Sequence, residues 1–235
     1  MTEPTAHRYA VYYAPAPDSP WWAAGRQWLG RCAAQDRPLA QPTVPGLTAA
    51  EFSALTAAPR RYGWHATLKA PFALSEGVSL TTLRAALREL GQSLTAFAMP
   101  TLRVARLDDF LALVPQGSAD RLQAVAAACV TQLNALSAPL SAAELQRRRQ
   151  AQLTPEQDQM LVRWGYPYVM EHFRFHCSLT GPLKGLSSIQ IDAVQGAAES
   201  LFHKLPACRL DTLALFAEPT PGADFLLLDH FGLRP

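Results

Sequence analysis

Apolar and polar residues alternate along several short segments of the chain, which is the pattern of β-strands with one buried face. The segment RYAVYYAP at 8–15 is rich in Tyr and Val and stops at prolines, so it predicts a strand. In RYGWHATLKA at 61–70 the odd positions are polar or small and the even positions are apolar. In HFRFHCSLT at 172–180 the even positions carry the polar side chains. Both segments predict strands with one polar and one apolar face.

Apolar residues at helical spacing predict helices between these strands. In 79–91, Ser79 supplies a cap, leucines recur at positions 80, 83, 87 and 90, and Gly91 is expected to end the helix. Further helices are predicted after Ser19 and Pro20, within the Pro-rich connection at 35–60, after Ser118, and over 187–204. Capping patterns at Ser141 and Thr154 predict a helical hairpin at about 141–165.

Two further pairs of strands are predicted. Residues 95–115 contain two apolar runs that are broken near Leu107 and Asp108, and two more runs meet at a Pro-Gly turn near the C-terminus. Each predicted histidine strand is therefore followed by a helix and a strand pair. This repeated order predicts a duplicated α+β unit in which a cleft between equivalent halves is the natural ligand site.

Composition and charge narrow the class of protein. About half of the residues are apolar (49%), 17% are charged, and the formal net charge is +2, which excludes a strongly basic nucleic-acid tail and a disordered chain. No stretch reaches the roughly 20 apolar residues of a membrane span, and MTEPTAHRY does not read as a leader, so we expect a cytoplasmic protein. The four cysteines form no C-x-x-C pair and are expected to be reduced, buried thiols.

Two histidines share a local pattern that points to chemistry. His65 and His176, 111 positions apart, each begin H-x-[ST]-L followed by [KT]-[AG]-P. An imidazole with a pKa near 6.5 can act as a general base or a general acid at neutral pH. Thr67 and Ser178 lie two residues further on, about 7 Å along the same strand face, where a hydroxyl can donate to an anionic oxygen. Cleavage of a phosphodiester requires that the nucleophile is deprotonated, that the leaving oxygen is protonated and that the non-bridging oxygens are bound.

These residues resemble a known superfamily. His65-Ala66-Thr67-Leu68 and His176-Cys177-Ser178-Leu179 look like the two motifs of the two-histidine (2H) phosphoesterases. RYAVYYAP, YGWHATLKAPF, WGYPYV and FRFHCSLTGPL look like its branch associated with carbon–phosphorus lyase operons and phosphonate metabolism. The resemblance implies one bilobal domain over 1–235 with interleaved lobes. We expect two antiparallel sheets to face a central cleft, with helices outside and the hairpin at 141–165 as an insertion.

The resemblance also implies roles for residues. His65 and His176 would be the catalytic acid–base pair, in an order that the sequence does not fix, and Thr67 and Ser178 would bind phosphate oxygens. Lys69 and Arg174 share the polar faces and are further candidates for phosphate binding. The aromatic rings of Tyr166 and Tyr168 are candidates for contact with a sugar. No metal or other cofactor is implied.

Alternatives remain at this point. His172 and His176 are four apart, a zinc-ligand spacing on a helix, but the FRFH alternation favours a strand, in which Cys177 points away from His176. Arg147–Arg149 could contact nucleic acid, although a solvated helix face is the commoner role. A small phosphorylated substrate is favoured, with ribose 1,2-cyclic phosphate as the concrete candidate. Processing of RNA ends or of nucleotide 2′,3′-cyclic phosphates, and a non-catalytic phosphate- or RNA-end-binding module, are the other functions considered.

Overall fold

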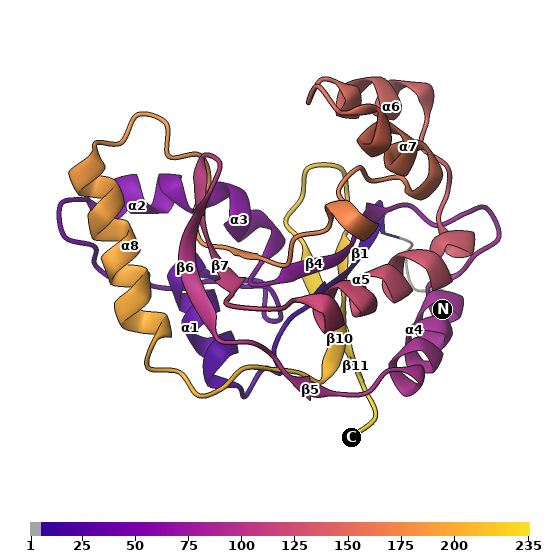
Figure 1. Cartoon of the computed structure of the whole chain (residues 1–235), viewed down its shortest axis with the longest axis horizontal. Helices are drawn as coiled ribbons and strands as arrows, with labels where there is room; N and C mark the ends of the chain where they lie inside the picture. Colours follow the sequence, from indigo (N-terminus) through magenta and orange to yellow (C-terminus); the bar gives the residue numbers. More distant parts are fainter. Residues whose placement is uncertain (1–5) are drawn as a thin grey trace.

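The computed structural model describes residues 6–235 and has the α+β class that the sequence predicts (Figure 1). The strands are β1 (Arg8–Tyr13), β2 (Arg31–Cys32), β3 (Arg37–Pro38), β4 (Ala66–Phe72), β5 (Phe97–Ala98), β6 (Leu102–Leu107), β7 (Phe110–Pro115), β8 (Cys177–Ser178), β9 (Arg209–Leu210), β10 (Thr212–Glu218) and β11 (Leu226–Gly232). The helices are α1 (Pro20–Leu29), α2 (Ala49–Leu55), α3 (Ala57–Tyr62), α4 (Leu80–Ser93), α5 (Asp120–Gln132), α6 (Ala142–Arg149), α7 (Pro155–Trp164) and α8 (Ser188–Phe202), with 3-10 turns η1 (Asn134–Leu136) and η2 (Met170–His172).

The strands form one large antiparallel sheet rather than the two that were predicted. Its order is β11-β10-β1-β4-β8-β7-β6, and β2-β3 and β5-β9 form two small separate pairs. The expected halves meet where β4 pairs with β8, at Ala66 and Cys177. Both side chains are buried, and the antiparallel pairing of their backbones joins the two halves of the sheet.

The helices cover the two halves of the sheet separately (Figure 1). Helix α4 packs against β10 and β11, and α5 packs against β4, whereas α8 packs against β6 and α1 packs against α3 and α8. Both histidine strands are followed by the same order of elements, namely a helix, a two-residue strand and a hairpin. Duplication of one unit remains a prediction. The hairpin of α6 and α7 forms as predicted and stands to one side of the sheet.

The strands at the two histidines are shorter than predicted. Residues 57–62 form helix α3, which ends at Gly63 with φ of +78°, and β4 begins only at Ala66. In the second segment η2 occupies residues 170–172, and β8 contains only Cys177 and Ser178. A glycine with positive φ turns the chain sharply from helix to strand, which alternation of residue types does not reveal. The polar faces predicted from alternation therefore begin at the histidines and not at Arg61 or His172.

Aromatic side chains fix helix α1 to both histidine segments. Trp64 is fully buried and stacks on Phe202 of α8 at 5.2 Å between ring centroids, next to Gly25 of α1, where any Cβ would overlap the indole. Trp28 of α1 donates its indole N–H to the carbonyl oxygen of Leu179 at 2.8 Å. The residues that precede His65 and follow His176 are thus held by one helix.

Two expectations from composition can be compared with the structure. All four cysteines are free and buried, as predicted. Within residues 6–235, no helix has both the length and the apolar character that crossing a bilayer requires. The reading of the N-terminus rests partly on residues 1–5, which lie outside the described residues.

Helix α4 does not end at Gly91, contrary to the prediction. It continues to Ser93, and Gly91 faces β11 where a Cβ would lie 2.8 Å from the carbonyl oxygen of Gly232. Glycine is therefore required here for close approach of a helix to a strand and not for termination.

Replacing this glycine should destabilise the protein. We expect Gly91→Ala to lower the free energy of unfolding by about 1–3 kcal/mol, because the added methyl overlaps backbone that cannot rotate away. Gly196→Ala in α8 is the matched control. Apart from its chain neighbours and the backbone of its own helix, no atom lies within 4 Å of its added Cβ, so the better helix propensity of Ala should stabilise by about 0.5–1 kcal/mol. Denaturant unfolding measures both; equal effects would contradict the close approach.

Candidate active site

The pairing of β4 with β8 places the two predicted motifs side by side. Ala66 lies opposite Cys177 in an antiparallel register. Extended by one residue in each direction, this register sets His65 opposite Ser178 and Thr67 opposite His176. Directly opposed side chains have Cβ atoms about 4.5–5.5 Å apart. Each histidine therefore faces the hydroxyl residue of the other motif, and all four side chains lie on the face opposite the buried Ala66 and Cys177.

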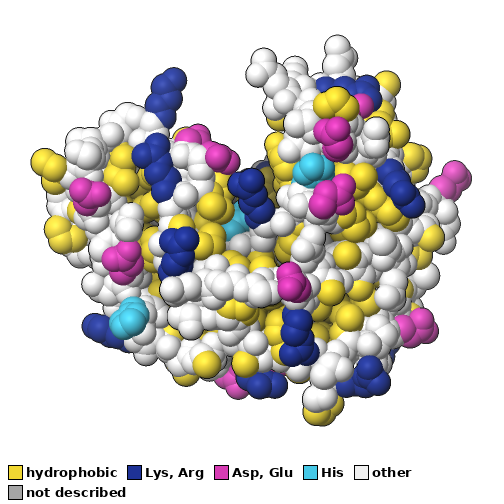
Figure 2. Space-filling model, in the orientation of Figure 1, with side chains coloured by type: hydrophobic (Ala, Val, Ile, Leu, Met, Phe, Trp, Pro, Cys, Tyr) yellow, Lys and Arg dark blue, Asp and Glu magenta, His cyan; other side chains and the backbone are white. Residues whose placement is uncertain are grey.

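These four residues line one cleft with a volume of about 430 Å³. Its wall also contains residues from β1, α3, the β6–β7 hairpin, α6 and the segments that follow α7 and β8, namely Arg8, Tyr12, Tyr62, Asp109, Phe110, Arg148, Tyr166 and Thr180. Figure 2 shows the molecule hollowed between the α2–α3 side and the α6–α7 side, with histidine and basic side chains at the bottom of the hollow. The four central residues of the predicted site are thus brought together.

The two imidazoles are held by the same local hydrogen bond. Nδ1 of His65 lies 2.8 Å from the carbonyl oxygen of Gly63, and Nδ1 of His176 lies 2.8 Å from the carbonyl oxygen of Arg174. A carbonyl oxygen only accepts, so both Nδ1 atoms carry the proton and donate it. This fixes the ring orientation and leaves Nε2 of each histidine as the atom that can take up or release a proton.

Burial keeps both imidazoles neutral at pH 7. His65 packs against the ring of Tyr12 at 3.9 Å, and His176 packs against Phe110 at 5.7 Å between centroids. Burial lowers the pKa of His65 to about 4, opposed by the Gly63 carbonyl and assisted by the nearby His176. Burial also lowers the pKa of His176, opposed by the carbonyl of Arg174. Without a bound anion, each ring can therefore accept a proton.

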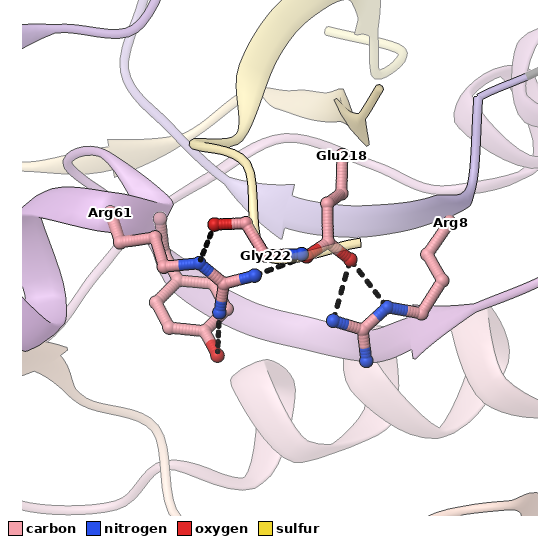
Figure 3. A network of polar contacts seen from close by, with 5 residues as sticks. Arg8, Arg61, Glu218 and Gly222 are labelled. Atoms are coloured by element: carbon pink, nitrogen blue, oxygen red, sulfur yellow. Dashed lines mark hydrogen bonds and ion pairs between the residues drawn. The ribbon is translucent and has the colours of Figure 1, made fainter. Parts of the chain in front are cut away.

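A buried carboxylate positions arginine at the cleft (Figure 3). Glu218 at the end of β10 accepts from Nε and Nη2 of Arg8 at 2.6 and 2.5 Å, from Arg61, and from the N–H of Gly222 at 2.9 Å. Burial raises the pKa of Glu218, but the hydrogen bonds from Arg8 and Gly222 and the charges of both arginines outweigh this effect and lower it. This ion pair holds Arg8 in the wall of the cleft.

Lys69 does not lie on the face that alternation predicts, and Arg174 lines a cavity next to the histidine cleft rather than the cleft itself. Lys69 is only 3% exposed and lines a separate cavity, because the pairing of β1 with β4 shifts register between Val11–Lys69 and Tyr12–Thr67. Such a bulge turns the following side chain away from the expected face. Arg174 is exposed and lines a third cavity, about 530 Å³ in volume, which shares Thr67 and His176 with the cleft.

The two candidate tyrosines separate in the structure. Tyr166 is half-buried and lines the histidine cleft and both neighbouring cavities. Tyr168 is 41% exposed, lines only the Arg174 cavity of these three, and meets Tyr166 edge-on at 5.5 Å. Of the two tyrosines, Tyr166 is therefore the one that can contact a ligand in the histidine cleft.

Arg148 is a cleft residue that sequence reasoning missed. Arg149 pairs with Asp158 at 2.6 and 2.9 Å, which ties α6 to α7, and Arg147 is exposed, so both fit the solvated face that was expected. Arg148 instead lies half-buried over the ring of Tyr166, 5.8 Å from its centroid, and lines the histidine cleft. A run of three arginines in the sequence does not reveal which of them faces the cleft.

The zinc alternative rested on His172 and His176. His172 lies in η2 and not in a strand as predicted, whereas Cys177 points into the core, away from the cleft that His176 lines. Among the described residues, no group of three or more His, Cys, Asp or Glu side chains is placed to hold a metal ion.

The fold and site together define an α+β protein with two opposed histidine–hydroxyl pairs in one cleft. By sequence, the chain belongs to the family described as protein of unknown function (DUF1045), which matches residues 67–226. It is 42% identical over 222 residues to ribose 1,5-bisphosphate phosphokinase PhnN of Janthinobacterium sp. (strain Marseille), covering 93% of this chain and 49% of the relative. It is 41% identical over 220 residues to the protein of that name from Laribacter hongkongensis (strain HLHK9), covering 94% and 50%. The chain spans about half the length of these relatives.

Histidine NMR checks the state of the two rings. At pH 7 we expect ¹⁵N spectra to show both imidazoles neutral, with Nδ1 protonated, because each Nδ1 donates to a carbonyl. Titration should protonate His65 only near pH 4, since burial opposes its charge, and His176 below the ordinary 6.5. A proton on Nε2 of the neutral ring, or a pKa above 6.5, would contradict this geometry.

Proposed function

We propose that this protein is a metal-independent cyclic phosphodiesterase, a hydrolase of the two-histidine phosphoesterase type. The observation that carries the proposal is the symmetry of the cleft. Two histidines with the same Nδ1 hydrogen bond lie opposite one another's hydroxyl residues in one cavity. Hydrolysis of a cyclic phosphate requires a base on one side of phosphorus and an acid on the other, and this arrangement supplies both.

In the proposed reaction, Nε2 of one histidine accepts a proton from water while the water oxygen bonds to phosphorus. The bond from phosphorus to one ring oxygen breaks, and Nε2–H of the other, protonated histidine donates its proton to that oxygen. The products are an acyclic phosphate monoester and a free hydroxyl. We assign the base to His65, because burial lowers its pKa to about 4, so that its ring is neutral and able to accept a proton at neutral pH.

The surroundings support binding of an anion. Thr67 and Ser178 present hydroxyls beside the histidines, and Arg8 and Arg148 add positive charge to the cleft wall. A bound phosphate next to an imidazole favours its charged form and raises its pKa. Substrate binding would therefore supply the protonated histidine that the free protein lacks at neutral pH.

The name of the relatives supports a ribosyl phosphate as the substrate. We do not propose that this chain is itself a kinase. These 235 residues contain no Gly-Lys pair, and hence no G-x-x-x-x-G-K-[ST] phosphate-binding loop of the P-loop kinases. Since the chain spans about half of each relative, we assign the named phosphokinase activity to their other half. Together with the resemblance to phosphonate-metabolism proteins, this favours ribose 1,2-cyclic phosphate as the substrate.

A second candidate substrate is a nucleotide 2′,3′-cyclic phosphate. The cavity beside His176 is lined by Phe110, Tyr168 and Phe173, with Arg174 at its rim. Aromatic side chains can stack on a nucleobase. Phosphorus NMR of both cyclic phosphates with the purified protein compares the two substrates directly.

Substitution of the histidines tests the proposed reaction. We expect His65→Ala and His176→Ala each to lower kcat by about 10²–10⁴-fold, because each removes one proton-transfer step. The double variant should be little slower than either single variant, since the two rings act in one step. His203→Ala, an exposed histidine after α8, is the matched control and should retain full activity. Circular dichroism verifies folding; full activity in either cleft variant would contradict the proposal.

The pH dependence gives a further test. The value of kcat/KM reports the pKa values of the free enzyme, and its maximum lies where the base is neutral and the acid is protonated. Burial lowers the pKa of both rings below 6.5, that of His65 to about 4. We therefore expect a bell-shaped profile that belongs to the coupled pair, with its maximum below pH 6.5. A maximum above pH 7, or a monotonic profile, would count against the two histidines as acid and base.

A further inference from the structure

A second cavity adjoins the histidine cleft. Its volume is about 360 Å³, and Arg8 and Tyr166 line both cavities. Its other walls come from β4, from the segment that follows α5, and from the α6–α7 insertion. Small-ligand sites have volumes of about 300–1,000 Å³, so this space can hold a functional group or a small molecule.

The residue that distinguishes this cavity is Lys69. Its side chain is 97% buried, and its ammonium lies 4.7 Å from the ring centroid of Phe72. Within residues 6–235, it has neither a carboxylate partner nor a hydrogen-bond acceptor. Burial lowers the pKa of Lys69 to about 8, with a smaller opposing effect from Cys129, so most of the amine remains charged at pH 7. An unpaired buried charge is unfavourable unless a ligand pairs it.

The other charged residues of the cavity leave it cationic. Among its described lining residues the one carboxylate is that of Glu144, which accepts from the backbone and the hydroxyl of Ser141 at 3.0 and 2.8 Å as a helix cap. Arg8 is already paired with Glu218, whereas Arg163 lies over the ring of Trp164 at 4.7 Å. The cavity therefore offers positive charge that no protein carboxylate neutralises at Lys69.

The position of Lys69 relates the cavity to the histidine cleft. Lys69 follows Thr67 by two residues on β4, which corresponds to about 7 Å along the strand. The register shift at this point turns Lys69 away from the face of Thr67 and into the adjoining cavity. A ligand of the size of a small sugar can therefore extend from the hydroxyl of Thr67 past Arg8 to Lys69.

We infer that the Lys69 cavity binds a second anionic group of the substrate whose cyclic phosphate lies between His65 and His176. This inference rests on the proposed function and narrows its substrate class to small cyclic phosphates that carry a further phosphate or carboxylate. Lys69 then contributes to substrate selection, because its charge is paired only when a ligand with a second anionic group is bound.

The test uses the whole 235-residue chain and a probe that cannot react. Calorimetric titration with ribose 5-phosphate should show binding to the wild type and binding weaker by about tenfold or more to Lys69→Met, the loss expected for one charge-assisted contact. Neutral ribose should bind far more weakly than its 5-phosphate. Ribonate, which carries a carboxylate, shows which anion the cavity prefers. Lys204→Met, an exposed lysine after α8, is the matched control and should bind as the wild type does.

Two further measurements make the outcome unambiguous. The double variant His65→Ala, His176→Ala should still bind ribose 5-phosphate in a manner that depends on Lys69; dependence on the histidines alone would overturn the inference. If Lys69→Met does not fold, NMR of the ¹³C-methylated wild type replaces it, because a bound anion should raise the pKa of Lys69. An unchanged pKa, or equal affinity of Lys69→Met and wild type, would also overturn it.

Failure of this inference is distinct from failure of the proposed function. Hydrolysis of cyclic phosphates without any preference for a second anionic group would overturn the role of Lys69 and leave the two-histidine reaction standing. Binding of ribose 5-phosphate through Lys69 without hydrolysis of any cyclic phosphate would support the cavity and overturn the reaction.

Discussion

The backbone pairing of Ala66 with Cys177 holds the two halves of the sheet together, and the rest of the site depends on it. Strands β4 and β8 meet edge to edge at this pair, and both side chains are buried on the face opposite the cleft. The hydrogen-bond register, rather than flexible side chains, therefore sets the separation of His65 from His176. Every other cleft residue is placed relative to this joint, including those of β1, which pairs with β4.

Desolvation and fixed charge set the electrostatics of the cleft, and both suit the anionic substrate of the proposed function. The histidines are packed against aromatic rings and tied through Nδ1 to backbone carbonyls, so they are neutral and oriented before a ligand arrives. Glu218 holds Arg8 in place, and its carboxylate offsets part of the positive charge of the Arg8 guanidinium. A ligand that brings negative charge and shares a proton with one ring would complement these groups best.

The helical insertion completes the site and separates its cavities. Capping boxes at Ser141 and Thr154 begin α6 and α7, and the pairing of Arg149 with Asp158 holds the two helices together. Arg148 and Tyr166 then reach the cleft, and Tyr166 lies at the boundary of all three cavities. In the proposed reaction, the insertion would therefore contact groups of the substrate beyond the cyclic phosphate.

The sequence by itself determined the elements whose signals are local. Caps and helical periodicity predicted α1, α4, α8 and the α6–α7 hairpin, and two repeats of one short motif predicted His65, Thr67, His176 and Ser178 as a group. Tertiary structure alone decided the positions of Lys69, Arg148 and Arg8. A register shift between paired strands redirects Lys69, one helix of an insertion turns Arg148 inward, and a carboxylate 210 residues away holds Arg8. Each of these depends on contacts between distant segments, which the pattern of a single segment does not contain.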